Sequence, residues 1–179
     1  MSVQIIFETH STSVDNEKEI ASGWFDCDLS ELGKEQAKDV GMRRSGENFD
    51  AIFVSDLKRA VQTAQIAFND KFPIIQDARL RECDYGDMNG KPEDEVKWQK
   101  PERIDNAFPN GESYRDTNVR MKLFLKDLLY KYDGKRVMIV GHRATQYALE
   151  SLILSKSLEE VIPAPWSWQP GWEYELKEI

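Results

Sequence analysis

The sequence has few cysteines, fewer basic than acidic residues, and no long apolar run. Its two cysteines, Cys27 and Cys83, stand far apart without a Cys-x-x-Cys pattern, which argues against a disulfide framework and fits reduced thiols. The 24 basic residues are outnumbered by 32 acidic ones, for a formal net charge of −8, so we expect neither a nucleic acid nor an anionic membrane as a partner. No stretch approaches the roughly 18 apolar residues that a membrane span needs.

We expect no basic leader region, because an apolar run begins as early as residue 3. The composition is that of a soluble globular protein: 179 residues, of which 40% are hydrophobic and 31% charged. This is enough apolar material for one sizeable core. We therefore predict a single cytoplasmic domain that covers residues 1–179.

Four apolar runs of strand length occur at residues 3–7, 51–54, 73–75 and 136–140. None alternates cleanly between polar and apolar residues, a pattern typical of strands buried on both faces. Apolar residues with helical spacing lie between the runs, as in 121–132. Strands that alternate with helices predict an α/β fold with a mostly parallel central sheet flanked by helices.

Serines that can cap helices mark three helix starts, at Ser30, Ser55 and Ser113. Each hydroxyl can accept a hydrogen bond from an amide of the first helical turn. A further helix is expected from about residue 144 to 154, and residues 171–176 have the pattern of a final edge strand.

Residues 80–110 show little periodicity and contain three prolines among mixed charges. This segment is long for a connection in a compact domain, and such insertions often form a lid or a substrate wall. The alternative is a solvated surface excursion with one short helix near residues 93–99.

Three residues of interest follow predicted strands. His10 comes after the first run and His142 after the fourth, while Arg59 lies in the first turn of the helix after the second. In open α/β sheets the ligand crevice lies beyond the carboxyl ends of the strands. Arginine forks and helix N-termini both favour phosphate oxygens, so we expect an anion site formed by these residues.

Six segments occur in an order and spacing typical of one enzyme family. They are THSTSVDN at 9–16, GWFDCDLSELG at 23–33, SDLKRAVQTA at 55–64, LRECDYG at 80–86, GES at 111–113 and GHR at 141–143. Together they resemble the motifs of the histidine phosphatase superfamily, branch 1, also called phosphoglycerate mutase-like, over nearly the entire chain. The resemblance implies a three-layer sandwich with a mostly parallel central sheet.

The resemblance also implies roles for individual residues. His10 is the expected nucleophile, Glu82 the general acid, and Arg59 and His142 the groups that bind the transferred phosphoryl group. No metal or other cofactor is expected, because the arginine and histidine cradle takes the electrostatic role that magnesium has in nucleotide-dependent phosphoryl transfer.

Neutral hydrogen bonds to phosphate or substrate are expected from Asn16 and Ser13. A zinc site is an alternative use of the same histidines, with His10, His142, Cys27 and Cys83 as ligands, but these residues lack the local spacing of zinc ligands.

The sequence departs from the family at the nucleophile. The arginine that normally precedes it is replaced by Thr9, which we place among the phosphate-binding residues, and a glycine that normally follows the second histidine is replaced by Arg143. We hypothesise that Arg143 takes over the role of the missing arginine. The alternative is that Arg143 points to solvent or pairs with Glu8 or Glu112.

The expected function is metal-independent hydrolysis of a phosphate monoester through a phosphohistidine intermediate. Mutases of the family carry extra segments that this chain lacks, which disfavours mutase activity. If the lost arginine is not replaced, the protein is a pseudo-phosphatase that binds its ligand without turnover. The partner is expected to be a small phosphorylated substrate or a phosphoprotein, and the sequence leaves its identity and the oligomeric state open.

Three tryptophans, Trp166, Trp168 and Trp172, lie near the final strand. They are candidates for the wall of a leaving-group pocket. The alternative is that they pack on the sheet as part of the core.

Overall fold

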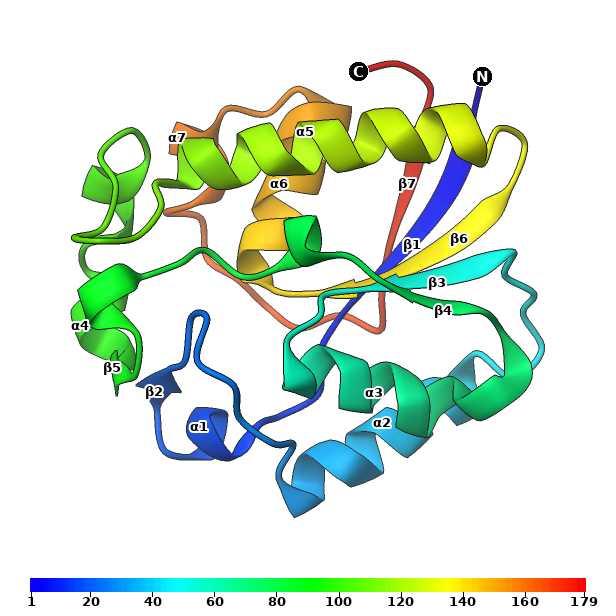
Figure 1. Ribbon diagram of the computed structural model, residues 1–179, viewed down its shortest axis with the longest axis horizontal. Coiled ribbons are helices and arrows are strands. Elements are labelled where there is room, and N and C mark those ends of the chain that lie inside the picture. The colour runs from blue at the N-terminus through cyan, green and yellow to red at the C-terminus, as the bar shows by residue number, and fades with distance from the viewer.

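A five-stranded sheet forms the centre of the molecule in the computed structural model, which describes residues 1–179 apart from the side chain of Asp70. The strand order is β4-β3-β6-β1-β7 (Figure 1). The strands are β1 (Val3–Thr9), β3 (Ala51–Val54), β4 (Ile74–Gln76), β6 (Arg136–Gly141) and β7 (Trp172–Leu176). All neighbouring pairs are parallel except β1 and β7. The mostly parallel sheet and the terminal edge strand were both predicted.

Helices cover both faces of the sheet (Figure 1). On one face lie α2 (Glu31–Arg43) and α3 (Lys58–Phe68), and on the other α5 (Tyr114–Lys131) and α6 (Arg143–Leu154). Each face has its own apolar cluster, because the sheet side chains alternate between Ile5 and Phe7 on the α5 side and Ile6 on the α2 side. The three-layer α/β sandwich is therefore confirmed.

Several short elements are too brief for periodicity to reveal. These are α1 (Val14–Glu17), β2 (Ile20–Ala21), β5 (Lys91–Pro92), α4 (Glu93–Lys97) and α7 (Leu158–Val161). Only α4 was predicted, as the short helix near residues 93–99. The antiparallel pair β2 and β5 connects the chain after His10 to the long segment 80–110. That segment buries apolar side chains of its own in a third cluster, including Cys83, Val96 and Phe108.

The helix caps show one error in the sequence prediction. The hydroxyls of Ser30 and Ser113 accept from first-turn amides, as expected. Ser55 is not an N-cap, because α3 begins only at Lys58. The first amide of α3, that of Lys58, donates instead to the carboxylate of Asp26 at 2.9 Å. A cap supplied from a distant loop leaves no local signal, which explains why the start was placed two residues early.

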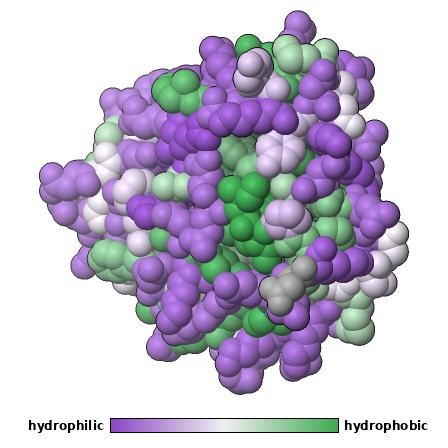
Figure 2. Space-filling model, turned by 45° about the vertical axis from the view of Figure 1, so that its right-hand side comes forward, coloured by the Kyte–Doolittle hydropathy of each residue, from purple (hydrophilic) through white to green (hydrophobic). Residues whose placement is uncertain are grey.

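The surface is mainly polar, and apolar side chains gather at the centre of the face drawn in Figure 2. The edge strand β4 also leaves Ile74 and Ile75 only half-buried. Within the residues described, no helix is long and apolar enough to cross a membrane.

Candidate active site

The carboxyl ends of β1 and β6 bring the two histidines together. The strands are parallel neighbours with Thr9 opposite Gly141, so His10 and His142 leave the sheet side by side. The backbone N–H of His10 donates to the carbonyl of Gly141 at 2.9 Å, and the imidazole centroids lie 5.0 Å apart. Arg59, in the first turn of α3, completes the group, because its Nε lies 3.3 Å from Nε2 of His10.

The ring of His10 is held in one tautomer. Its Nδ1 lies 2.7 Å from the backbone carbonyl of Ser11, and because a carbonyl oxygen only accepts, Nδ1 carries the proton. Nε2 therefore keeps its lone pair and accepts from Arg59. Burial, and then the positive charge of Arg59, lower the pKa of His10 from 6.5 to about 3. The imidazole is thus neutral near pH 7, the state that a nucleophile needs.

The ring of His142 places a buried N–H donor beside His10 and Arg59. The residue is 1% exposed, and its Nδ1 lies 3.4 Å from Nη2 of Arg59. Since a guanidinium only donates, the proton of the neutral ring lies on Nε2, an atom that is buried without a hydrogen-bond partner among the described residues. Burial, together with the charge of Arg59, holds the pKa of His142 well below its ordinary value. An anion would satisfy this donor.

Arg59 is a buried cation without an ion pair in the part of the chain that the structure describes. It is 2% exposed, and its guanidinium donates to the backbone carbonyls of Gly23 at 2.8 Å and Phe25 at 3.1 Å. Carbonyl oxygens orient the fork but leave its charge uncompensated. A buried charge of this kind is stabilised by a counter-ion, and a phosphoryl group supplies one.

A cavity of about 580 Å³ opens at this edge of the sheet. Its size lies in the range of small-molecule sites and exceeds the volume of a phosphate. The predicted site residues that line it are Thr9, His10, Asn16, Arg59, Glu82, His142 and Arg143. The structure thus brings together all of the predicted site residues except Ser13.

Ser13 lies outside the cavity and is fully buried. It is the N-cap of α1, where its hydroxyl accepts from the backbone N–H of Asn16 at 3.1 Å and donates to Oδ1 of Asn16 at 2.9 Å. The side-chain amide nitrogen of Asn16 remains available for a ligand. Asn16 is therefore the candidate donor, whereas Ser13 has a capping role.

Glu82 reaches the cavity with one carboxyl oxygen fixed. The residue is 7% exposed, and its Oε1 accepts from the backbone N–H of Cys83 at 2.8 Å and of Ala144 at 3.3 Å. Its Oε2 has no hydrogen bond to the residues described. A carboxyl with one oxygen anchored and the other free suits proton transfer to a ligand in the cavity.

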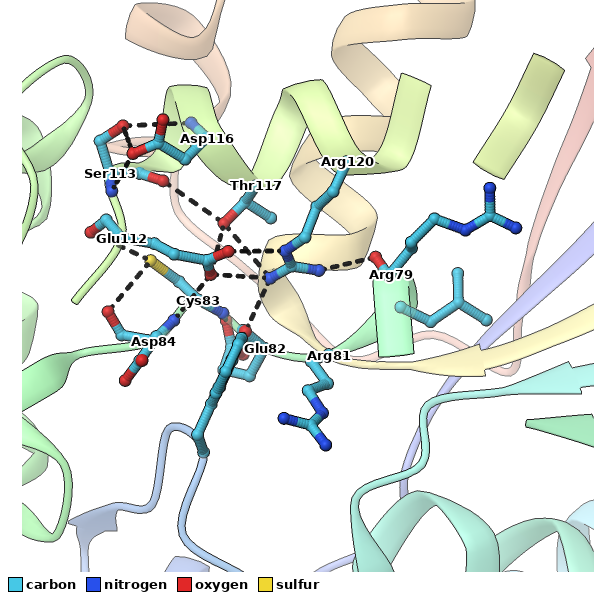
Figure 3. Close-up of polar contacts among 12 residues, drawn as sticks. Arg79, Arg81, Glu82, Cys83, Asp84, Glu112, Ser113, Asp116, Thr117 and Arg120 are labelled. Atoms are coloured by element: carbon cyan, nitrogen blue, oxygen red, sulfur yellow. Dashed lines mark hydrogen bonds and ion pairs between the residues drawn. The ribbon is translucent and has the colours of Figure 1, made fainter. Parts of the chain in front are cut away.

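Behind Glu82, an arginine clamp fixes the backbone that carries it (Figure 3). Arg120, on α5, donates to the carbonyls of Arg79 at 2.6 Å and Glu82 at 2.8 Å. It also binds both carboxylate oxygens of Glu112, at 2.9 and 3.0 Å. Glu112 in turn accepts from the backbone N–H of Asp84 at 3.0 Å. Glu112 lies in the 111–113 motif, but no role was predicted for Arg120, since one arginine among the charged residues of a long amphipathic helix carries no distinguishing signal.

Arg143, the first residue of α6, lines the cavity beside an aromatic ring. Its guanidinium carbon lies 4.3 Å from the ring centroid of Trp166, and its Nε donates to the hydroxyl of Tyr147 at 3.4 Å. The two carboxylates considered as its partners, Glu8 and Glu112, are bound by other arginines. Within the residues described, Arg143 has no ion pair.

Glu8 forms a buried ionic group that the sequence analysis missed. It is 1% exposed on β1 and accepts from Arg43 at 3.0 Å and from Arg44 at 2.9 Å. The arginine pair at the end of α2 is visible in the sequence, but its partner depends on how α2 crosses β1. Because two cations neutralise this carboxylate, it does not oppose an anion in the cavity.

The tryptophans divide between the two predicted uses. Trp166 and Trp168 line the cavity. Trp172 packs on Phe7 of β1, with ring centroids 5.7 Å apart. The core packing is thus confirmed for Trp172, and Trp166 and Trp168 lie in a cavity wall, whose role as a leaving-group pocket stays a prediction.

The residues of the alternative zinc site are not assembled. Cys27 and Cys83 do not line the cavity, and burial raises the pKa of the Cys83 thiol. Among the residues that the structure describes, no group of three or more His, Cys, Asp or Glu could hold a metal ion.

Sequence relatives of the chain include mutases. It is 34% identical over 178 aligned residues to a 2,3-bisphosphoglycerate-dependent phosphoglycerate mutase of Rhizobium meliloti (strain 1021), covering 90% of this chain and 84% of the relative. A protein with the same name from Bartonella tribocorum is 32% identical and covers 98% of this chain and 97% of its own length.

Solved structures with the same fold include Bacillus stearothermophilus YhfR, with a TM-score of 0.82, 27% identity and coverage of 94% of this chain and 88% of the other. A mycobacterial glucosyl-3-phosphoglycerate phosphatase has a TM-score of 0.79 at 24% identity, covers 90% of this chain and 85% of its own, and supports the fold alone. The family model described as histidine phosphatase superfamily (branch 1) matches residues 5–167. The chain therefore belongs to the histidine phosphatase superfamily, branch 1.

Proposed function

We propose that the protein is a metal-independent phosphatase that hydrolyses a phosphate monoester through a phosphohistidine on His10. The observation that carries the proposal is the tautomer of His10: the bond from Nδ1 to the Ser11 carbonyl leaves the Nε2 lone pair in the cavity. Beside it lie the buried fork of Arg59 and the unpartnered donor of His142. A neutral nucleophile next to two donors is what phosphoryl transfer requires.

The reaction has two halves. In the first, Nε2 of His10 attacks phosphorus, the bond from phosphorus to the leaving oxygen breaks, and protonated Glu82 gives its proton to that oxygen. In the second, Glu82 takes a proton from water, the water oxygen attacks phosphorus, and the phosphorus–nitrogen bond breaks. Inorganic phosphate leaves, and His10 and Glu82 return to their starting states.

Arg143 replaces the missing cradle arginine in this proposal. Position 9 lies opposite Gly141 in the register of β1 and β6, so residue 143 lies two residues beyond the end of the neighbouring strand. Thr9 and Arg143 line the same cavity, and no carboxylate among the described residues neutralises the guanidinium. Its two Nη groups are thus free for phosphoryl oxygens.

The charges of the cavity favour a monoester over a bisphosphate. Four acidic and four basic side chains line it: Glu8, Asp39, Glu82 and Glu93, and Arg43, Arg59, Lys100 and Arg143. Arg43 is already paired with Glu8, so once Arg59 and Arg143 bind the first phosphate, Lys100 is, among the described residues, the one cavity-lining cation left for a second. This supports hydrolysis rather than a mutase reaction with a bisphosphate.

Residues 80–110 are proposed to form the wall on the leaving-group side. The segment supplies Glu82, Tyr85, Glu93, Val96 and Lys100 to the cavity lining. A small phosphorylated molecule or a phosphorylated side chain of a protein remains the proposed partner. A cytoplasmic location and a single-domain organisation stay predictions of the sequence.

A pseudo-phosphatase is the second candidate, because Thr9 stands where the family has an arginine. Loss of one cradle donor in a desolvated site costs about a hundredfold to a thousandfold in rate if nothing replaces it. The retained acid, Glu82, argues for turnover, since a pure binder has no use for a proton donor with a free oxygen in the cavity.

Hydrolysis of an aryl phosphate between pH 5 and 8, with a chelator present, tests the proposal. Wild type should turn over, and His10→Ala should lose at least about a thousandfold in kcat. The exposed variant Trp98→Ala, whose side chain lies outside the cavity, should match wild type. Equal activity in wild type and His10→Ala would refute the nucleophile. Phosphate binding without turnover in wild type would favour the pseudo-phosphatase.

A further inference from the structure

The segment 165–172 lies against Arg143 and is held at several points. Trp166 carries the contact, with its ring centroid 4.3 Å from the guanidinium carbon of Arg143. On α6 the only other polar contact of that guanidinium is the long bond to Tyr147, at 3.4 Å. The direction of the Arg143 side chain therefore depends mainly on where Trp166 stands.

Trp166 is itself fixed in place. Its indole N–H donates to Oε1 of Gln146 at 2.8 Å. Its ring stacks on Trp172, with centroids 6.2 Å apart and planes 29° apart, and Trp172 packs on Phe7 at 5.7 Å. An aromatic column thus leads from strand β1 to Arg143.

The two arginines of α2 hold the rest of this segment. Arg44 donates to the backbone carbonyl of Pro170 at 2.6 Å, and the guanidinium of Arg43 lies 5.7 Å from the ring centroid of Trp168. Both are anchored by the buried Glu8. Gly171 has φ +102°, and a Cβ there would lie 2.1 Å from Nη2 of Arg44, so this close approach requires glycine.

Trp166 has a cavity on each side. It lines the 580 Å³ cavity of the candidate site and a second one of about 280 Å³ between the segment and α6. The hydrogen bond to Gln146 and the stack on Trp172 therefore hold the indole between the two cavities.

A stacked indole differs from a carboxylate as a partner for arginine. A carboxylate would neutralise the charge and occupy the in-plane N–H groups, as Glu8 does for Arg43. An indole attracts the guanidinium through its face and leaves the N–H edges of the plane free. Trp166 therefore orients Arg143 without consuming its charge.

We propose that Trp166 is a positioning residue for Arg143, so that the segment 165–172 forms part of the phosphate-binding machinery. This rests on the proposed role of Arg143 in the cradle. Gln146 and Trp172 act one step further away, by holding Trp166. Segment 165–172 thereby fixes the orientation of the Arg143 side chain, whereas an arginine at position 9 would have been held by strand β1 itself.

The test is a double-mutant cycle on the affinity for orthovanadate, a mimic of the transferred phosphoryl group, measured by calorimetry. Arg143→Ala should weaken vanadate binding by about a hundredfold, and Trp166→Ala by about tenfold. The double variant should bind as Arg143→Ala does, because Trp166 acts only through Arg143. Trp166→Phe should restore most of the affinity, since a phenyl face also attracts a guanidinium, and Trp98→Ala should match wild type.

Gln146→Leu offers a second route if Trp166→Ala does not fold. It removes the acceptor of the indole N–H without changing the lining of the candidate site. Gln146→Leu should weaken vanadate binding when Arg143 is present, but should have no effect when it is added to Arg143→Ala. Additive losses in either cycle would overturn the inference. If instead Arg143→Ala itself binds vanadate as wild type does, the proposed cradle role of Arg143 fails, and the inference fails with it for that separate reason.

Discussion

The two charged walls of the cavity are held in opposite ways. The wall that carries Glu82 is fixed by polar contacts: an Arg120–Glu112 clamp binds its backbone, and two amides bind its Oε1. The wall that carries Arg143 is held by aromatic rings. A proton donor works with one oxygen anchored by hydrogen bonds, whereas a phosphate-binding cation needs its charge and its N–H groups left free. The difference shows how the type of support fits the task of the residue.

Among the residues of these two walls, the largest effect should come from the acid Glu82. Glu82→Gln keeps the hydrogen bonds to Oε1 but removes the transferable proton, so kcat for an alkyl phosphate should fall by about a hundredfold to a thousandfold. With a nitrophenyl ester, whose leaving group needs no proton, the loss should be far smaller. Equal losses on the two esters would show that Glu82 is not the acid.

Breaking the Arg120–Glu112 clamp tests how the polar wall is held. Arg120→Met leaves the carboxylate of Glu112 without its partner and frees two backbone carbonyls, and it should lower the free energy of unfolding by about 3 kcal/mol. Adding Glu112→Leu should recover part of that loss, because no unpaired charge then remains. Denaturant unfolding of the two variants measures both values. A double variant less stable than the single one would contradict the clamp.

A substitution at Gly171 tests how the aromatic wall is held. Gly171→Ala forces a side chain into a left-handed backbone position and against Arg44, so it should cost about 1–2 kcal/mol of stability. Gly46→Ala is a matched control, because a Cβ at Gly46 meets nothing within 4 Å. If the two alanine variants have the same melting temperature, Gly171 has no special role in holding the segment.

The smallest effect concerns the cradle between the two walls. The pKa of His10 is about 3 in the folded protein and near 6.5 in the unfolded chain, so the unfolded state binds more protons between these values. The resulting stability is fully present above about pH 6.5 and is lost as the pH falls. Between pH 7 and 6, wild type should therefore lose about 0.7 kcal/mol more stability than His10→Asn. Parallel losses in both proteins would contradict a buried, neutral His10.

Much of the fold followed from the sequence because its signals are local. The four apolar runs became the four parallel strands, and Ser30 and Ser113 cap helices as expected. The start of α3 was misplaced because Asp26 caps it from another loop. The elements β2, β5 and α7 have two to four residues each, too few for any periodic pattern.

The candidate site was partly predictable for the same reason. His10, Arg59 and His142 follow strands, so the topology alone gathers them. The Arg120 clamp, the Glu8 pairs and the stack of Trp166 on Trp172 join residues that are distant along the chain. Their partners depend on how α2, α5 and the final segment cross the sheet, which no spacing in the sequence encodes.

The most direct test of the account is to trap the phosphorylated enzyme. Wild type is mixed with a monoester that carries labelled phosphorus, quenched in base within milliseconds, and mapped by mass spectrometry. The account predicts a label on His10 that survives base, is lost in acid, and is absent from His10→Ala. Turnover by wild type without labelled His10, or with the label on a serine or threonine, would contradict it.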